Sequence, residues 1–216
     1  MTALRVFILA ALAATAGHAA APEPRLMVFY VEAPPTKTAA VVAALEVQAR
    51  ADQAAGASAE VLSESGRPGR MVLIERWRDL SEDQAGRRAK ALDARLGPDL
   101  QAPVDDRLND PIVPLDMKPA PAGAFHMLTH IDVVPDGAEA ARQALMAQKT
   151  LMMLAPGALA FEAGSQTGRP NHFAVYETWK SRAAYESYVA SAAGQDLRRR
   201  LTPFKGAPFD DRFYGP

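Results

Sequence analysis

The sequence of 216 residues predicts an α+β protein made of two tandem copies of one βαββαβ unit, the ferredoxin-like fold. Short motifs recur in the same order in both halves, and within each half the hydrophobic periodicity alternates between strand-like and helix-like. A proline-rich stretch lies between the halves and indicates an extended linker. We therefore expect a first domain at residues 24–109, a linker at residues 110–122 and a second domain at residues 123–216.

The repeat is visible in four pairs of segments: 56–59 with 157–160, 66–68 with 168–170, 75–77 with 177–179, and 102–108 with 207–213. The second pair reads Gly-Arg-Pro in both halves, and the third reads Glu-x-Trp. One such match could arise by chance, whereas four in register indicate an internal duplication.

Each element of the second copy has a local signal. Strand formers alternate over 125–134, and Asp136 is placed to cap an amphipathic helix over 138–154. Pro156 and Gly157 end that helix, and a turn at 167–171 joins strands expected at 159–166 and 172–179. Ser181 caps a helix predicted to run to about residue 201, and a last strand covers 209–214.

The first copy gives the same order over residues 25–109. A single unit of this kind leaves one face of its sheet uncovered. We expect the two copies to cover each other, sheet against sheet, within one chain.

The N-terminus predicts a secretory signal peptide at residues 1–20. Arg5 precedes an apolar run over residues 6–14, and small residues follow at Gly17, Ala19 and Ala20. The run is shorter than the roughly 20 residues of a membrane span. We expect an exported protein, periplasmic or secreted, without stable membrane insertion after cleavage; an uncleaved anchor helix is the alternative.

Composition excludes several kinds of site. The chain has no cysteine, so disulfides, thiolate nucleophiles and cysteine-ligated metals are ruled out. The net charge is -1, which leaves no basic excess for a nucleic-acid backbone. Neither a dinucleotide fingerprint nor a phosphate-binding loop occurs in the sequence.

Residues 156–162 (PGALAFE), 171–179 (NHFAVYETW) and the start of the following helix at 180–185 (KSRAAY) resemble the antibiotic biosynthesis monooxygenase (ABM) domain family. Members are dimeric α+β barrels, and many oxidise phenolic or quinol substrates with O2 and neither metal nor flavin. The resemblance therefore implies an intrachain dimeric α+β barrel and a reaction without cofactor. One departure is that residues 191–195 lack the histidine that family members often carry there.

The three histidines that follow the predicted signal peptide, His126, His130 and His172, all fall in the second copy. Because imidazole is the commonest proton carrier near neutral pH, His130 and His172 are our candidate catalytic bases. We expect His130 to face the beginning of the strand that carries His172. His126 and His130 would lie about 13 Å apart on one strand, too far to share an ion, so no metal site is predicted.

The substrate-binding candidates are His126, Phe125, Phe173, Glu177 and Trp179. Alternation places the last three on one face of a strand. Tyr185 and Tyr188 supply further aromatic material for a pocket, which we expect between the sheet and the helices of the second copy. The run 198–200 (RRR) is interpreted as a solvated helix end.

Two classes of function remain open at this stage, and a third has less support. The first is a protein that binds a small aromatic or quinone-like molecule and acts as a cofactor-independent monooxygenase. The second is a non-catalytic ligand-binding or assembly module, which a filled interior would favour. Haem binding is the third, and a further homo-oligomer is compatible with each.

Overall fold

The computed structural model describes residues 24–215, so the predicted signal peptide lies outside the described residues. None of the helices in the described range is long and apolar enough to cross a membrane.

The helices and strands follow the predicted order in both units. The first unit contains β1 (Arg25–Glu32), α1 (Thr38–Ala54), β2 (Ser58–Ser63), β3 (Arg70–Trp77), α2 (Glu82–Leu96) and β4 (Asp105–Pro111). The second contains β5 (Phe125–Asp132), α3 (Ala138–Met152), β6 (Ala158–Gln166), β7 (Arg169–Trp179), α4 (Arg182–Val189), α5 (Ala192–Leu201) and β8 (Asp210–Tyr214).

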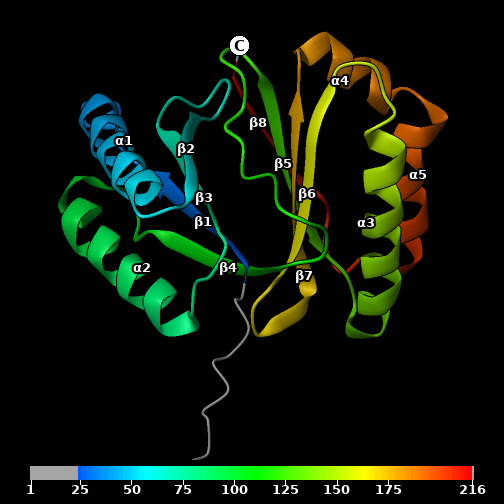
Figure 1. Ribbon diagram of the computed structural model, residues 1–216, viewed down its shortest axis with the longest axis horizontal. Coiled ribbons are helices and arrows are strands. Elements are labelled where there is room, and N and C mark those ends of the chain that lie inside the picture. The colour runs from blue at the N-terminus through cyan, green and yellow to red at the C-terminus, as the bar shows by residue number, and fades with distance from the viewer. Residues whose placement is uncertain (1–23, 216) are drawn as a thin grey trace, which may run out of the picture.

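The two units share one sheet of eight strands in the order β2-β3-β1-β4-β6-β7-β5-β8. The strand β4 pairs with β6 across the units. At the other edge, an isolated bridge joins Glu64 to Tyr214, and the Ser65 amide donates to the Phe213 carbonyl at 2.7 Å. The sheet thus nearly closes into a barrel, with α1 and α2 on one side and α3 and α5 on the other (Figure 1). The predicted α+β fold with two tandem units is confirmed.

The repeated Gly-Arg-Pro segment is the hairpin turn of each unit. Gly66 and Gly168 both have φ of +77°, a left-handed conformation that glycine adopts without steric cost. The duplicated motif is therefore explained by the turn, which needs a residue with positive φ where it joins β2 to β3 and β6 to β7.

Two of the predicted boundaries change. The helix expected from Ser181 to about residue 201 is two helices, because Ser191 caps α5 by accepting from the Gly194 amide at 3.1 Å. A side chain at Gly194 would collide with the Tyr188 backbone, which lies against it at this break. Pro111, which was expected in the linker, ends β4 opposite Gly164.

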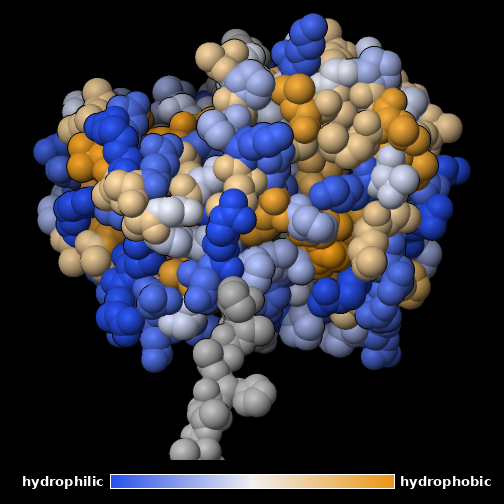
Figure 2. Space-filling model, viewed as in Figure 1, coloured by the Kyte–Doolittle hydropathy of each residue, from blue (hydrophilic) through white to orange (hydrophobic). Residues whose placement is uncertain are grey.

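Three apolar clusters hold the molecule together. One lies under the helices of each unit, and the third fills the middle of the barrel: Leu26, Val28, Tyr30, Val72, Ile74, Leu128, Tyr176 and Tyr214. The outer surface in Figure 2 is mostly polar, with apolar side chains gathered over the upper part of the second unit. The loop after α3 carries Leu154, which is 80% exposed.

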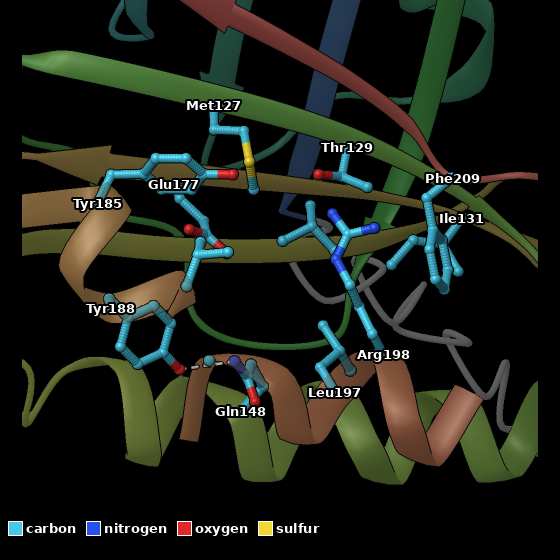
Figure 3. Close-up of a pocket in the computed structure, with 13 residues that line it drawn as sticks. Met127, Thr129, Ile131, Gln148, Glu177, Tyr185, Tyr188, Leu197, Arg198 and Phe209 are labelled. Atoms are coloured by element: carbon cyan, nitrogen blue, oxygen red, sulfur yellow. Dashed lines mark hydrogen bonds between the residues drawn. The ribbon is translucent and has the colours of Figure 1, made fainter. Parts of the chain in front are cut away.

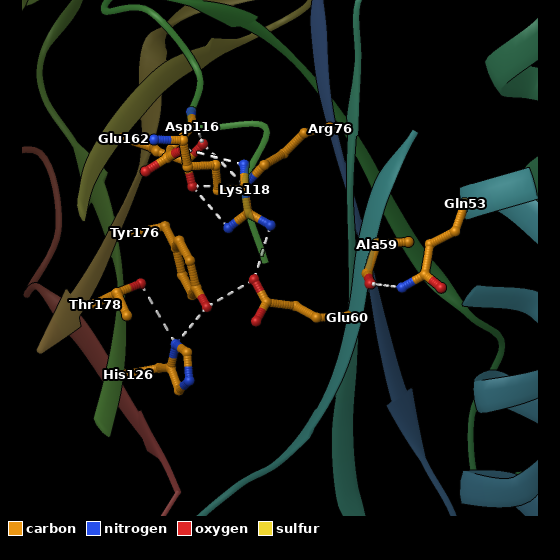
Figure 4. Close-up of polar contacts among 10 residues, drawn as sticks. All are labelled: Gln53, Ala59, Glu60, Arg76, Asp116, Lys118, His126, Glu162, Tyr176 and Thr178. Carbon is orange, nitrogen blue, oxygen red and sulfur yellow. Dashed lines mark hydrogen bonds and ion pairs between the residues drawn. The ribbon is translucent and has the colours of Figure 1, made fainter. Parts of the chain in front are cut away.

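The barrel interior becomes polar toward one end, where a buried ion-pair network joins the units (Figure 4). Arg76 on β3 bonds Glu162 on β6 at 2.7 Å and Glu60 on β2 at 2.7 Å. The Asp116 amide of the linker also donates to Glu162, at 2.9 Å. Because a buried guanidinium needs such partners, this network fixes the register between the units and the course of the linker.

Candidate functional site

A cavity lies in the second unit between the sheet and the helices α3, α4 and α5 (Figure 3). Its volume is about 30 Å³. Thr129 and Glu177 line it from the strands, and Gln148, Tyr188 and Arg198 from the helices. A small cavity is therefore present at the predicted place, between sheet and helices of the second unit, while a hollow of about 610 Å³ also lies beside Trp77 and Arg88 in the first unit.

Glu177 is the buried carboxyl of this cavity. It lies on β7, where alternation turns it toward the helices together with Val175 and Trp179. The Trp179 Nε1–H donates to Glu177 Oε2 at 2.9 Å. Burial raises the pKa of Glu177 to about 7, the charge of Asp211 also raises it, and the Trp179 bond and Arg198 act to lower it. This carboxyl can therefore take up and release a proton near neutral pH.

Aromatic side chains form the wall beside the carboxyl. The Trp179 ring lies 5.0 Å from that of Tyr188 and 6.1 Å from that of Tyr185, between ring centroids. Tyr188 Oη accepts a hydrogen bond from Gln148 Nε2 at 2.6 Å. Burial raises the pKa of Tyr188 to about 12, so its hydroxyl stays protonated at neutral pH.

A guanidinium lies at the other end of the cavity, where Arg198 reaches from α5 toward the strands (Figure 3). Arg198 Nη2 contacts Asp211 Oδ2 at 2.6 Å, and Asp211 accepts a second bond from Thr129 Oγ1 at 2.9 Å. Asp211 thus fixes Arg198 beside the cavity, where a positive charge can stabilise an anion formed by proton transfer to Glu177.

The first unit carries the same carboxyl–indole pair in different surroundings. The Trp77 Nε1–H donates to Glu75 Oε2 at 2.8 Å, and Arg88 lies 3.2 Å from the same oxygen. Arg88 also pairs with Asp52 on α1 and stacks over the Trp77 ring at 4.5 Å. Burial and the neighbouring Asp52 raise the pKa of Glu75 to about 8. Here two carboxyls share one guanidinium.

The predicted substrate-binding residues separate into two groups. Phe125, Phe173, Glu177 and Trp179 all point to the helix side of the sheet and belong to one core or line its cavity. Phe125 packs on Tyr185 with ring centroids 5.4 Å apart.

His126, by contrast, points into the barrel. Its ring stacks on Tyr176, and its Nδ1 lies 2.5 Å from Tyr176 Oη (Figure 4). Burial lowers the pKa of His126.

The two candidate bases also lie away from the cavity. His130 points into the barrel and faces Ala174 on β7, two residues along that strand from His172, so it lies opposite the expected strand and near His172 without pairing with it. Burial, with the charges of Arg107 and Arg212, lowers the pKa of His130 to about 3. His172 instead faces Asp132, with Nδ1 and Oδ1 2.8 Å apart at the barrel edge. The sheet register separates the two histidines by two residue pairs, because His130 pairs with Ala174 and His172 pairs with Asp132.

Sequence reasoning missed Gln148 and misassigned Arg198. Gln148 is the one polar residue among the buried positions of α3, and this interruption of an apolar stripe was the available signal. The prediction of a solvated run holds for Arg199 and Arg200 but not for Arg198, which pairs with Asp211 beside the cavity. Nothing local distinguishes the three arginines. Among the described residues, no group of His, Asp or Glu is arranged to hold a metal ion.

The fold and this site define a tandem dimeric α+β barrel with a carboxyl-containing cavity in its second unit. Residues 124–200 match the family model described as antibiotic biosynthesis monooxygenase. The resemblance predicted from the sequence is thus confirmed, with the family's domain in the second unit. No curated protein matches the chain by sequence.

Solved structures match nearly the whole chain. A protein provisionally named a monooxygenase, from Lactobacillus acidophilus NCFM, has a TM-score of 0.69 at 14% identity, covering 89% of this chain and 93% of that one. An anthrone oxidase-like protein has a TM-score of 0.66 at 15% identity, and the match covers 89% of this chain and 90% of that one. A staphylococcal protein described as a major regulator of pathogenesis has a TM-score of 0.61 at 13% identity, and the match covers 89% of this chain and 98% of that one. At these identities the likeness is one of fold.

Proposed function

We propose that the second unit binds a small aromatic or quinone-like molecule beside Glu177 and oxidises it with O2 as a cofactor-independent monooxygenase. The observation that carries the proposal is a buried carboxyl with a pKa of about 7 against an aromatic wall. The ABM match and the fold shared with an anthrone oxidase-like protein support the reaction class.

Glu177 takes a proton from an acidic C–H or O–H group of the substrate, and Arg198 offsets the charge of the resulting anion. The anion then gives one electron to O2, the substrate radical and superoxide combine as a peroxide anion, and this anion takes the proton back from Glu177 to become a hydroperoxide. For a methylene substrate, loss of water from the hydroperoxide leaves a ketone. One oxygen atom enters the product, the other leaves as water, and both hydrogens of the methylene end in that water.

The size of the cavity favours a second candidate, a non-catalytic ligand-binding or assembly module. Its volume of about 30 Å³ holds about one water molecule, whereas pockets for drug-sized ligands begin near 300 Å³. Substrate entry therefore requires α4 and α5 to move away from the sheet. The break between them at Ser191 provides the place where they could do so.

Oxygen uptake with anthrones and hydroquinones tests the proposal. We expect uptake by the wild type and a loss of about 100-fold or more in Glu177→Gln, the size expected for removing a general base. Glu75→Gln is the matched control, because it alters the same Glu-x-Trp pair in the first unit and should keep the rate per folded molecule. His130→Ala and His172→Ala should also retain uptake, since both lie outside the cavity.

An absence of uptake above buffer with all these substrates would contradict the enzyme proposal and favour the assembly module. Equal loss in Glu75→Gln and Glu177→Gln would show that the effect is on folding. Far-ultraviolet circular dichroism of each variant separates this case from a loss of chemistry.

A further inference from the structure

Each unit carries a groove at the same place, between the end of its first helix and the start of its second. In the second unit the groove has a volume of about 630 Å³ and lies where the loop after α3 approaches α4 and α5 (Figure 1). In the first unit it has a volume of about 610 Å³ and lies between the end of α1 and the start of α2. The residue before the repeated glycine lines each groove, Ala55 in one and Pro156 in the other. The two grooves are therefore equivalent by the internal duplication.

The linings of the two grooves differ in charge. Four of the nine residues that line the first groove are charged: Arg78, Asp79, Arg87 and Arg88. Ten residues line the second groove and none of them is charged; seven are apolar, and the others are Ser187, Tyr188 and Ser191. Arg87 follows its capping serine by the same number of residues as Ser187 does, so a serine stands in the second groove where the first has an arginine. The two copies thus share a hollow, and only the one in the second unit is apolar.

The lip of the second groove exposes apolar side chains to solvent. Leu154, in the loop after α3, lines the groove and is 80% exposed, and its neighbour Met153 is 42% exposed. The first unit has Gln53 at the position of Leu154, counted from the repeated glycine. Burial of such apolar surface against a ligand is favourable, and the groove has no charged group that would pair with an ionic ligand. The second groove therefore favours an uncharged apolar ligand.

The second groove adjoins the Glu177 cavity. Tyr188 lines both, and its hydroxyl is turned to Gln148 on α3 (Figure 3). The break between α4 and α5 contributes Ser191 to the groove and Gly194 to the cavity. The cavity holds about one water molecule, whereas the volume of the groove falls within the roughly 300–1,000 Å³ of pockets for drug-sized ligands. A molecule in the groove therefore lies next to the side chain and the chain break that close the cavity.

We propose that the groove of the second unit binds an uncharged aromatic molecule of two or three fused rings, which packs against Tyr188 and Pro156. The small side chains of Ala183, Ala184 and Ala193 leave room for flat rings. The proposal rests on the proposed function in one respect, because the bound molecule is the substrate that Glu177 deprotonates once α4 and α5 have moved.

A second copy of this chain is the alternative occupant of the groove. A hollow of this size takes up only a few side chains, whereas a specific interface between proteins buries about 1,000 Å² or more. A second copy would therefore need contacts beyond the groove, while a fused-ring molecule is matched to the groove alone.

The test is fluorescence titration of the full chain with N-phenyl-1-naphthylamine, an uncharged probe with two fused rings. We expect one site per chain. Ser187→Arg gives the second groove the residue of the first, and should weaken binding about tenfold because the guanidinium would lose hydration beside the rings. Leu154→Gln exchanges the lip residue in the same way and should weaken binding about threefold, through lost apolar contact. The mirror change Arg87→Ser, in the first groove, is the matched control and should bind the probe as the wild type does.

Two further measurements separate this proposal from the proposed oxidation. Anthrone should displace the probe from the wild type and from Glu177→Gln alike, since Glu177 lies outside the groove. Oxygen uptake by Ser187→Arg should need about tenfold more anthrone to reach half of its maximal rate. Probe binding that Ser187→Arg weakens, without oxygen uptake by any of the proteins, would contradict the oxidation and support the groove as a binding site. Uptake with the same dependence on anthrone in wild type and Ser187→Arg would contradict the groove and leave the oxidation supported.

The positions of Leu154 and Ser187 are exposed, so thermal melting of both variants should match that of the wild type. Equal probe binding by the wild type, Ser187→Arg and Leu154→Gln would overturn the proposal, because the probe would then lie elsewhere. A dimer that sedimentation velocity detects in the wild type but not in Ser187→Arg, without probe binding, would also overturn it and would identify a second copy as the occupant.

Discussion

The two Glu-x-Trp pairs show how a duplicated element acquires different chemistry. In both units the indole N–H bonds the carboxyl two residues before it, at 2.8 Å in the first unit and 2.9 Å in the second. The difference comes from the helix that covers the carboxyl. Arg88 and Tyr188 occupy equivalent positions in the two units, because each follows its capping serine, Ser81 or Ser181, by the same number of residues.

Arg88 draws Glu75 into an ion-pair cluster with Asp52. Tyr188 instead bonds Gln148, and Glu177 faces a cavity. The strand motif thus conserves a buried carboxyl through the duplication, while one helix position decides whether the carboxyl is paired with a cation or available for proton transfer.

The largest expected effect is a loss of stability when the ion pairs of Glu75 in the first unit are broken. Arg88→Met removes the guanidinium shared by Glu75 and Asp52, and should lower the free energy of unfolding by about 3 kcal/mol at pH 8. The loss should shrink toward pH 5, because protonation of the carboxyls removes the unpaired charge. Urea unfolding at both pH values measures it. The mirror change Tyr188→Phe should cost only about 1 kcal/mol, at both pH values alike. Equal costs for the two changes would contradict the comparison.

The second effect concerns the pH dependence of stability. The pKa of Glu177 is raised to about 7 in the folded state, above the value of about 4.3 expected in the unfolded chain. The folded state therefore holds the extra proton between these values, and the associated stability is present below pH 4 and lost as pH rises through 7. Relative to Glu177→Gln, the wild type should lose up to about 3 kcal/mol between pH 4 and pH 8. Parallel stability curves for the two proteins would show that Glu177 is not perturbed.

The smallest expected effect is a change in the pKa of Glu177 when its hydrogen bond from the Trp179 indole is removed. Because the Trp179 N–H favours the ionised carboxylate, Trp179→Phe should raise the pKa of Glu177 by about one further unit. Carbon-13 NMR titration of the Glu177 carboxyl measures the shift whether or not the protein is an enzyme. Trp77→Phe is the matched change in the first unit and should leave that titration in place. A titration of Glu177 that moves in both variants would mean that the two sites are coupled.

Much of the fold was open to prediction because its determinants are local. Strand alternation, the capping serine Ser181 and the Gly-Arg-Pro turns act over a few residues, and each was recognisable in one sequence. The same alternation placed Glu177 and Trp179 on one strand face. The missed break before α5 depends on Ser191 and Gly194, whose local signal was overridden by the continuous helical pattern around them.

By itself, the sequence determined the two-unit architecture, the turns and the faces of the strands, because these follow from backbone preferences and hydrophobic periodicity. Only the tertiary structure decided which distant groups meet. The pairing of β4 with β6 closes the barrel around His126 and His130, and the packing of α5 brings Arg198 to the carboxyl cavity. Burial against these partners also sets the pKa of Glu177 near 7 and that of His130 near 3. Proton affinity depends on surroundings contributed by remote segments, and no local pattern records it.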